Sequence, residues 1–257
     1  MGFQPVESTP QVRCNTVTSG EFLSLYERAL DENILAGELR LPSRTFAPSQ
    51  IRCKRVSWFR LRGVTPEPET EVDRVLNFTT QVGTACHQTI QGILSNKLGN
   101  NWIDPETYLK QTDLPYQYIC TKNGFETLIE ISKPVPIKFA PDGIFFWQDK
   151  YWLLEIKTSE HSSFEKLTTV KSQHLDQIKC YATLLNIHNV LVIYQDRAFG
   201  GLKCFEVIIT DADMKQIWNM FREVQDYVAK NIAPNKPEDT RYCNPSYCRY
   251  YSKCKEW

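Results

Sequence analysis

Two carboxylates and a lysine lie close together in the segment that begins at Pro141-Asp142 and continues to Glu155-Ile156-Lys157. The stretch 143–157 is typical of a β-hairpin, because two apolar runs flank a polar turn at 148–150. Strand side chains alternate, so we expect Glu155 and Lys157 on one face and Ile156 on the other. Two carboxylates can hold a divalent cation that activates water, and a lysine can stabilise charge on a phosphate. Such a set of groups could hydrolyse a phosphodiester.

The same hairpin alone also fits a solvated strand edge, and acidic and basic residues at this spacing more often belong to such an edge. The residues elsewhere in the chain decide between the two interpretations. The functional interpretation therefore depends on which other side chains are expected near the hairpin.

The composition is that of an ordinary soluble globular protein with room for one sizeable core: 257 residues, 42% hydrophobic and 23% charged. The sequence has no apolar run long enough to span a membrane and does not start like a signal peptide, so we expect a cytoplasmic location and no membrane partner. The formal net charge is zero. Binding to nucleic acid would then need local basic patches. Candidates gather in two segments: Arg52, Lys54, Arg55, Arg60 and Arg62, and Arg241, Arg249, Lys253 and Lys255.

Helical and strand patterns alternate in an order that predicts an α/β protein, with a central mixed β-sheet flanked by helices. We expect helices at 19–35, within 50–63, at 72–98 with a break near Gly83, at 169–186, and at 211–230 after an N-cap at Thr210 or Asp211. We expect strands at 125–132, 137–147, 151–158, 189–195 and 203–209. The Pro- and Glu-rich segment 64–71 reads as an exposed loop.

Polar residues on two of these helices could join the hairpin. His87 shares a helix face with Ile90 and Leu94, so it is expected to point inward, either as an ordinary core histidine or as a metal ligand. Gln177 and Tyr181, with Gln173, form a stripe at helical spacing directly after the candidate strand. Such a stripe is ordinarily solvent-facing, but here it could orient the lysine, water or a substrate phosphate.

The order of these motifs resembles the RecB-type branch of the PD-(D/E)xK nucleases: Gly83 to His87, Pro141-Asp142, Glu155 to Lys157, and Gln177 to Tyr181. The resemblance covers roughly residues 50–257. It implies that His87, Asp142, Glu155 and the Ile156 carbonyl bind Mg²⁺ or Mn²⁺. It also implies that Lys157 is the catalytic lysine, with Gln177 and Tyr181 in supporting roles.

The cysteines are concentrated at the C-terminus, where Cys243, Cys248 and Cys254 follow one another closely. Without a secretory signal they favour reduced thiols or metal ligation over disulfides. With Cys53 they resemble the four cluster ligands of the CRISPR-associated Cas-four family, of AddB and of exonuclease V, which implies a [4Fe–4S] cluster. The C-x4-C-x5-C spacing departs from the family's more usual C-x2-C-x5-C, so a zinc site is the alternative.

Four segments are expected: a loose leader at 1–18, a helical segment with the first cluster cysteine at 19–71, a PD-(D/E)xK core at 72–232, and a cysteine-rich segment at 233–257. Aromatic and basic residues interleave near the last cysteines, where rings could stack on bases or shield the cluster. Weak DNA-contact candidates are Arg55, Arg60, Arg249 and Tyr250.

The resemblance implies a metal-dependent exonuclease on single-stranded or frayed DNA ends, acting with proteins of recombination, replication, repair or CRISPR adaptation. Three alternatives stay open at this point. The chain could be a structure-specific endonuclease with the same core, or a DNA-binding or scaffolding protein that has lost turnover. It could also be an iron–sulfur electron carrier.

Overall fold

The computed structural model describes residues 16–37, 44–67, 73–122, 126–131, 135–238, 240–245 and 247–256. Within these ranges the main sheet has five strands in the order β1 (Trp102–Ile103), β5 (Gly143–Trp147), β6 (Lys150–Ser159), β7 (Asn189–Asp196) and β8 (Leu202–Ile208). Strands β6 and β7 are parallel, and the other neighbours are antiparallel. The prediction of a mixed sheet flanked by helices is confirmed.

A second, antiparallel sheet contains β2 (Gln117–Lys122), β3 (Glu126–Ile131) and β4 (Ile137–Phe139). The expectation of one strand over 137–147 is wrong, because β4 and β5 belong to different sheets. The chain changes sheet at Pro141, which has no N–H group to donate to a strand ladder. Asp142 therefore stands at the entrance of β5, next to the central strand.

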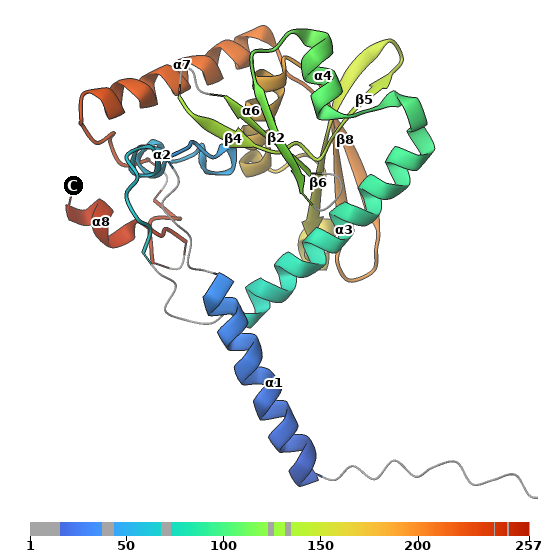
Figure 1. Ribbon diagram of the computed structural model, residues 1–257, viewed down its shortest axis with the longest axis vertical. Helices are drawn as coiled ribbons and strands as arrows, with labels where there is room; N and C mark the ends of the chain where they lie inside the picture. The colour runs from blue at the N-terminus through green and yellow to red at the C-terminus, as the bar shows by residue number, and fades with distance from the viewer. Residues whose placement is uncertain are drawn as a thin grey trace, which may run out of the picture.

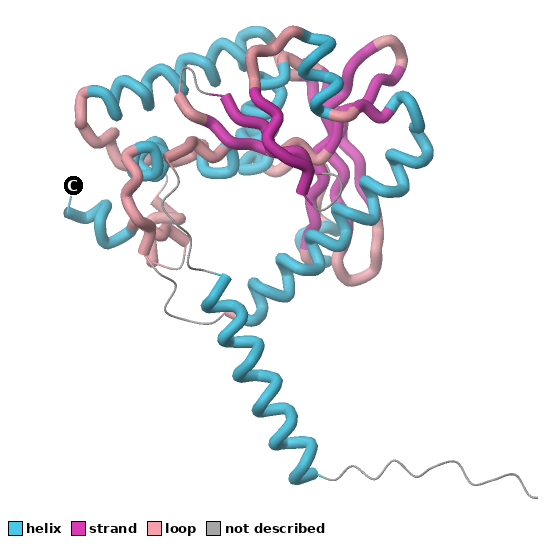
Figure 2. Tube along the Cα trace, viewed as in Figure 1, coloured by secondary structure: helices cyan, strands magenta, loops and turns pink. Residues whose placement is uncertain are grey.

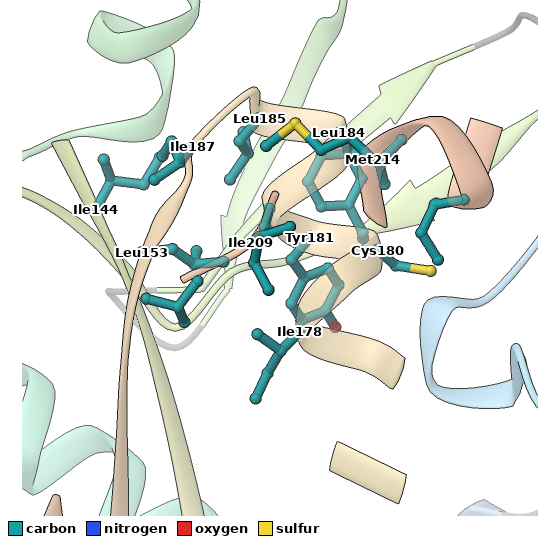
Figure 3. Close-up of a cluster of buried hydrophobic side chains, with 14 of the residues drawn as sticks. Ile144, Leu153, Ile178, Cys180, Tyr181, Leu184, Leu185, Ile187, Ile209 and Met214 are labelled. Carbon is teal, nitrogen blue, oxygen red and sulfur yellow. The ribbon is translucent and has the colours of Figure 1, made fainter. Parts of the chain in front are cut away.

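The two faces of β6 are covered by different helices, as the side-chain alternation requires. Helix α3 (Arg74–Leu98) places Ile90 and Leu94 against Leu154 and Ile156. Helix α6 (Ser172–Leu185) covers the opposite face, and α7 (Asp211–Ala229) packs against α6 in the same core (Figure 2). Figure 3 shows this core, which includes Leu153, Ile178, Leu185 and Met214. Functional groups on β6 are thereby held between two layers of helices.

Two helix predictions have opposite outcomes. Helix α7 begins as expected, because the Thr210 hydroxyl accepts from the Asp213 N–H while the Asp213 carboxylate accepts from the Thr210 N–H. The break expected near Gly83 is wrong, since α3 runs through it without interruption. The cost of one helical glycine is about 1 kcal/mol, and the packing of α3 on β6 outweighs it.

The remaining elements lie at the periphery: α1 (Thr16–Gly37), η1 (Pro48–Gln50), α2 (Lys54–Leu61), η2 (Gly99–Asn101), α4 (Pro105–Thr112), α5 (His161–Glu165) and α8 (Tyr251–Glu256). The sequence predicted α1 and a short helix at α2, but not α4, α5, α8, β1 or β2. Helix α1 extends away from the rest of the chain (Figure 1). It begins at Thr16, inside the expected leader, while residues 1–15 and 68–72 lie outside the described part of the chain.

Helix α2 and the C-terminal segment meet although they are distant in sequence, as Figure 1 shows. The Glu67 carboxylate accepts from the Ser252 N–H at 2.8 Å, and the Glu67 N–H donates to the Arg249 carbonyl at 2.6 Å. These contacts join the two segments that carry the candidate cluster cysteines. In the described ranges, no helix has both the length and the apolar character needed to cross a membrane.

Gly143 lets the tryptophan of β1 pack over the start of β5, because a Cβ atom there would lie 2.4 Å from Trp102 Cη2. We predict that Gly143→Ala displaces the indole or the strand and lowers the free energy of unfolding by about 1–3 kcal/mol in urea titrations. The double variant Gly143→Ala/Trp102→Leu should recover part of the lost free energy of unfolding, because the smaller side chain leaves room for the added Cβ atom. Gly20→Ala, where nothing lies within 4 Å, is the control. Equal midpoints for Gly143→Ala and wild type would contradict the packing argument.

Candidate active site and cysteine region

Glu155 and Lys157 meet on the α6 side of β6. The Lys157 Nζ atom lies 2.5 Å from Glu155 Oε1, and the Glu155 and Lys157 side chains are 1% and 18% exposed. Ile156 points to the opposite face, into the apolar contact with α3. The expected alternation is confirmed, and the hairpin is not a solvated edge.

Asp142 is held next to this pair by three residues of β6 and α3. Its Oδ2 atom accepts from the Ile156 N–H at 2.6 Å, and its Oδ1 atom lies 3.1 Å from His87 Nδ1. The buried Gln91 side chain donates to the Asp142 carbonyl at 2.7 Å. Helix α3 thus supplies both His87 and Gln91, of which the sequence predicted only the histidine. Ile156 enters this network through its N–H group, whereas the resemblance implied its carbonyl.

Helix α6 positions the lysine from the other side. The Gln177 Oε1 atom accepts from Lys157 Nζ at 3.3 Å, and Gln177 Nε2 donates to the Tyr181 hydroxyl at 2.9 Å. Tyr181 lies in the core (Figure 3) and Gln177 is half-buried, whereas Gln173, the first residue of the predicted stripe, is exposed. The seven residues that the sequence grouped (His87, Asp142, Glu155, Ile156, Lys157, Gln177 and Tyr181) come together in one network.

Burial controls the charges of the central pair. Burial raises the pKa of Glu155 to about 7, against the opposing effect of the Lys157 ammonium. For Lys157, burial alone would lower the pKa, but the Glu155 and Asp142 carboxylates outweigh it and the pKa is raised. The lysine is therefore an ammonium group at neutral pH. It can donate to a phosphate oxygen but is a poor general base.

The donor set fits a hard divalent cation such as Mg²⁺ or Mn²⁺. Glu155 Oε2 is buried without a hydrogen-bond partner, and the Asp142 carboxylate and His87 imidazole lie beside it in the network. Across the described residues, however, no three His, Cys, Asp or Glu side chains already surround a common point. Binding a cation would thus require the carboxylates to loosen their contacts with Lys157 and His87.

His174 and Tyr194 adjoin this network but were not singled out from the sequence. His174 Nδ1 lies 2.7 Å from the Tyr194 hydroxyl, and Tyr194 pairs with Lys157 in the parallel register of β6 and β7. Burial, with the nearby charges of Lys157, Lys171 and Arg52, lowers the pKa of His174 to about 3. The imidazole is therefore neutral. From the sequence, His174 could have been found because it lies about one helical turn before Gln177 on the same helix.

The four candidate cluster cysteines gather in one region, where α2 meets the C-terminal segment. Burial raises the pKa of Cys53 and of Cys248. The charges of Cys243 and Cys254 add to this at Cys53, and those of all three other cysteines add at Cys248. All four are free thiols. They lie near one another without surrounding a common point in the described ranges.

Two of the four weak DNA-contact candidates have buried side chains. Arg55 is 6% exposed and Tyr250 is 4% exposed, with the Tyr250 ring stacked on Phe59 at 5.3 Å. Their burial argues against direct DNA contact by these side chains, although Tyr250 also lines the cavity that Arg60 and Arg249 line. Arg60 and Arg249 are half-buried and line an open cavity, so they stay candidates.

Arg55 instead connects the cysteine region internally. Its guanidinium donates to the Pro234 carbonyl at 2.6 Å, to the Cys254 carbonyl at 3.0 Å and to Cys254 Sγ at 3.2 Å. These bonds join α2 to the C-terminal segment at one of the candidate cluster ligands.

No family model and no curated protein matches the sequence. The structure is similar to the crystal structure of SSO0001, with a TM-score of 0.51 and 16% identity over 91% of this chain and 98% of that chain. At this identity the similarity shows a shared fold alone.

An alkaline exonuclease from Laribacter hongkongensis, LHK-Exo, is less similar. Its TM-score is 0.45 at 14% identity, over 78% of this chain and 93% of that chain. The LHK-Exo complex with dAMP gives a TM-score of 0.44 at 15% identity over the same shares. Both scores are too low to support an argument about this chain.

Metal binding at this network should depend on pH. Protons compete at Glu155, whose pKa is raised to about 7, and at His87, whose pKa Asp142 raises against the effect of burial. We predict that Mn²⁺ raises the melting temperature more at pH 8 than at pH 6, because bound ligand stabilises the folded state. Glu155→Gln should lose this difference. An equal Mn²⁺ shift at both pH values would contradict the assignment.

Without metal the same carboxyl has the opposite effect on stability. Its folded-state pKa lies above the ordinary value of 4.5, so it favours folding at low pH, and this contribution is lost as the pH rises through about 7. The metal-free chain and the Mn²⁺-loaded chain should therefore differ most in melting temperature at high pH.

Replacing Arg55 should loosen the cysteine region. We predict that Arg55→Met lowers the free energy of unfolding by about 2–4 kcal/mol, because buried carbonyl acceptors lose a charged donor. Arg62→Met, an exposed position at the end of the same helix, should cost less than about 1 kcal/mol. Urea denaturation of both variants measures the difference. Equal costs would show that the Arg55 bonds do not stabilise the junction.

Proposed function

We propose that the chain is a divalent-metal-dependent DNA nuclease with a PD-(D/E)xK core. The observation that carries the proposal is the buried Glu155–Lys157 pair, with one carboxylate oxygen unpartnered and Asp142 fixed beside it. Burying charges is costly, and replacing a buried ion pair with apolar residues is often neutral or stabilising for the fold. The presence of this pair therefore favours a functional role. The motif order of the RecB-type nucleases supports the same assignment.

Asp142 and Glu155, with His87, would hold Mg²⁺ or Mn²⁺, which when bound supplies charge neutralisation at the phosphate and activation of water. The chain's own groups do the rest. The Lys157 ammonium donates to a phosphate oxygen and stabilises the charge that develops there. Gln177 and Tyr181 keep the lysine pointed toward the carboxylates. Gln91 and the Ile156 N–H fix Asp142 from two sides.

Cys53, Cys243, Cys248 and Cys254 would hold a [4Fe–4S] cluster, with Zn²⁺ as the alternative. Four free thiols in one region, at the junction of α2 and the C-terminal segment, support a structural site that fastens the two segments together. Visible absorption with iron and zinc analysis of anaerobically purified protein distinguishes the two. Colourless protein that contains zinc would favour the zinc site. Protein that contains neither iron nor zinc would contradict metal binding by these cysteines.

Replacing the lysine tests the activity. We predict that Lys157→Ala reduces Mn²⁺-dependent cleavage of labelled single-stranded DNA by at least about 100-fold, as expected for loss of one charge-stabilising group. Lys150→Ala, at the exposed turn of the same hairpin, should cleave at the wild-type rate. If wild type with Mn²⁺ leaves DNA intact, the chain is better described as a DNA-binding or scaffolding protein. Activity that survives in Lys157→Ala would remove the lysine from the mechanism.

The substrate we propose is a single-stranded or frayed DNA end, so the enzyme would be an exonuclease that works with proteins of recombination, replication, repair or CRISPR adaptation. A structure-specific endonuclease with the same core is the alternative. End-labelled linear DNA and covalently closed single-stranded circles separate the two. Stable circles support an end-dependent enzyme, and cleaved circles support the endonuclease.

A further inference from the structure

A large cavity separates α6 from the C-terminal cysteine segment. Its volume is about 1110 Å³, and its lining includes Arg52 and Gln177 as well as Tyr242, Tyr247 and Arg249. The proposed cluster ligands Cys53, Cys243 and Cys248 line it too, so a bound cluster would take up part of this volume. Pockets for single small molecules occupy roughly 300–1000 Å³. This cavity has room for a ligand longer than one nucleotide.

Gln177 connects the cavity with the candidate active site, whose Lys157, Glu155 and Asp142 do not themselves line it. Gln177 lines it and at the same time accepts from Lys157 Nζ at 3.3 Å. A polymer whose phosphodiester lies at Lys157 would therefore continue past Gln177 into this space. This path from Lys157 into the cavity rests on the proposed function, because it assumes that the phosphodiester is cleaved at Lys157.

The wall charges suit a polyanion. Five Lys or Arg side chains line the cavity against three Asp or Glu side chains. Two of the cations are engaged in ion pairs, Arg52 with Asp176 at 2.7 Å and Lys54 with Glu223 at 2.6 Å. These groups are about 40% exposed, and ion pairs at such positions are weak, so a phosphate can replace the carboxylates at small cost.

Two tyrosines that line the cavity present rings to solvent. Tyr247 is 70% exposed and Tyr242 is 43% exposed, and their centroids lie 5.6 Å apart in an edge-to-face arrangement. The Arg241 guanidinium lies 6.0 Å from the Tyr242 centroid. Rings this exposed do not shield the thiols from water, whereas the buried, stacked Tyr250 does. Exposed rings beside cations are what base stacking along a phosphate backbone requires.

We infer that this cavity is a binding groove for single-stranded nucleic acid, in which Tyr242 and Tyr247 stack on bases and the basic walls contact phosphates. In a duplex the bases are stacked on their neighbours, so their faces are not available to these rings. The groove holds the strand on one side of Lys157 and thereby favours single-stranded over duplex substrate.

Binding of fluorescein-labelled oligo(dT) tests the groove independently of cleavage. Measurements by anisotropy use the full chain carrying Lys157→Ala, without added divalent metal, so that the strand stays intact. Tyr247→Ala in this background should weaken binding about 10-fold and the double Tyr242→Ala/Tyr247→Ala variant about 100-fold, given roughly 1–3 kcal/mol per stacked base. Tyr247→Phe keeps the ring and should bind as the parent does.

Tyr118→Ala, an exposed tyrosine on β2, is the matched control and should bind as the parent does. Melting temperatures equal to that of the parent show that the tyrosine variants fold. A double variant that binds within twofold of the parent would overturn the groove, as would a blunt-ended two-strand duplex that binds as tightly as oligo(dT).

The two proposals fail separately. Tyrosine-dependent binding with no cleavage by wild type would leave the groove standing and remove the nuclease. If wild type cleaves DNA but binding does not depend on the two tyrosines, the nuclease proposal stands and the groove proposal is wrong.

Discussion

Glu155 is a carboxyl group in the central strand of the sheet, covered on both sides by helices, and the arrangement around it follows from that burial. A charge at this depth needs a counter-charge or hydrogen bonds. Lys157 supplies the counter-charge at Glu155 Oε1, while Glu155 Oε2 has no hydrogen-bond partner. The unpartnered oxygen is the position at which we propose that a divalent cation binds.

The surrounding elements are arranged to keep this incomplete pair in place. Helix α3 reaches Asp142 through His87 and Gln91, while α6 reaches Lys157 through Gln177. The two helices lie on opposite faces of β6, so the site is assembled at the edge where both layers meet the β5–β6 hairpin. Tyr194 and the neutral His174 extend the network along β7 and α6 toward the cavity.

Much of this could be predicted from local pattern, and the failures share one cause. The alternation of Glu155, Ile156 and Lys157 and the cap of α7 at Thr210 are local properties, and the structure bears them out. The continuity of α3 through Gly83 depends on its packing against β6, which local propensity does not contain. The burial of Arg55 and Tyr250 depends on α2 meeting the C-terminal segment across most of the chain. Basic and aromatic residues beside cysteines suggested a DNA surface, but only the three-dimensional contact separates the buried Tyr250 from the exposed Tyr247.

The unpartnered oxygen of Glu155 offers the most direct test of the proposed metal site. Anomalous diffraction from crystals soaked in Mn²⁺ would locate the cation without reference to activity. We predict a peak within about 2.0–2.5 Å of Glu155 Oε2 and of an Asp142 carboxylate oxygen, distances usual for hard divalent ions with oxygen ligands. Full occupancy elsewhere, with Glu155 still paired to Lys157 alone, would contradict it.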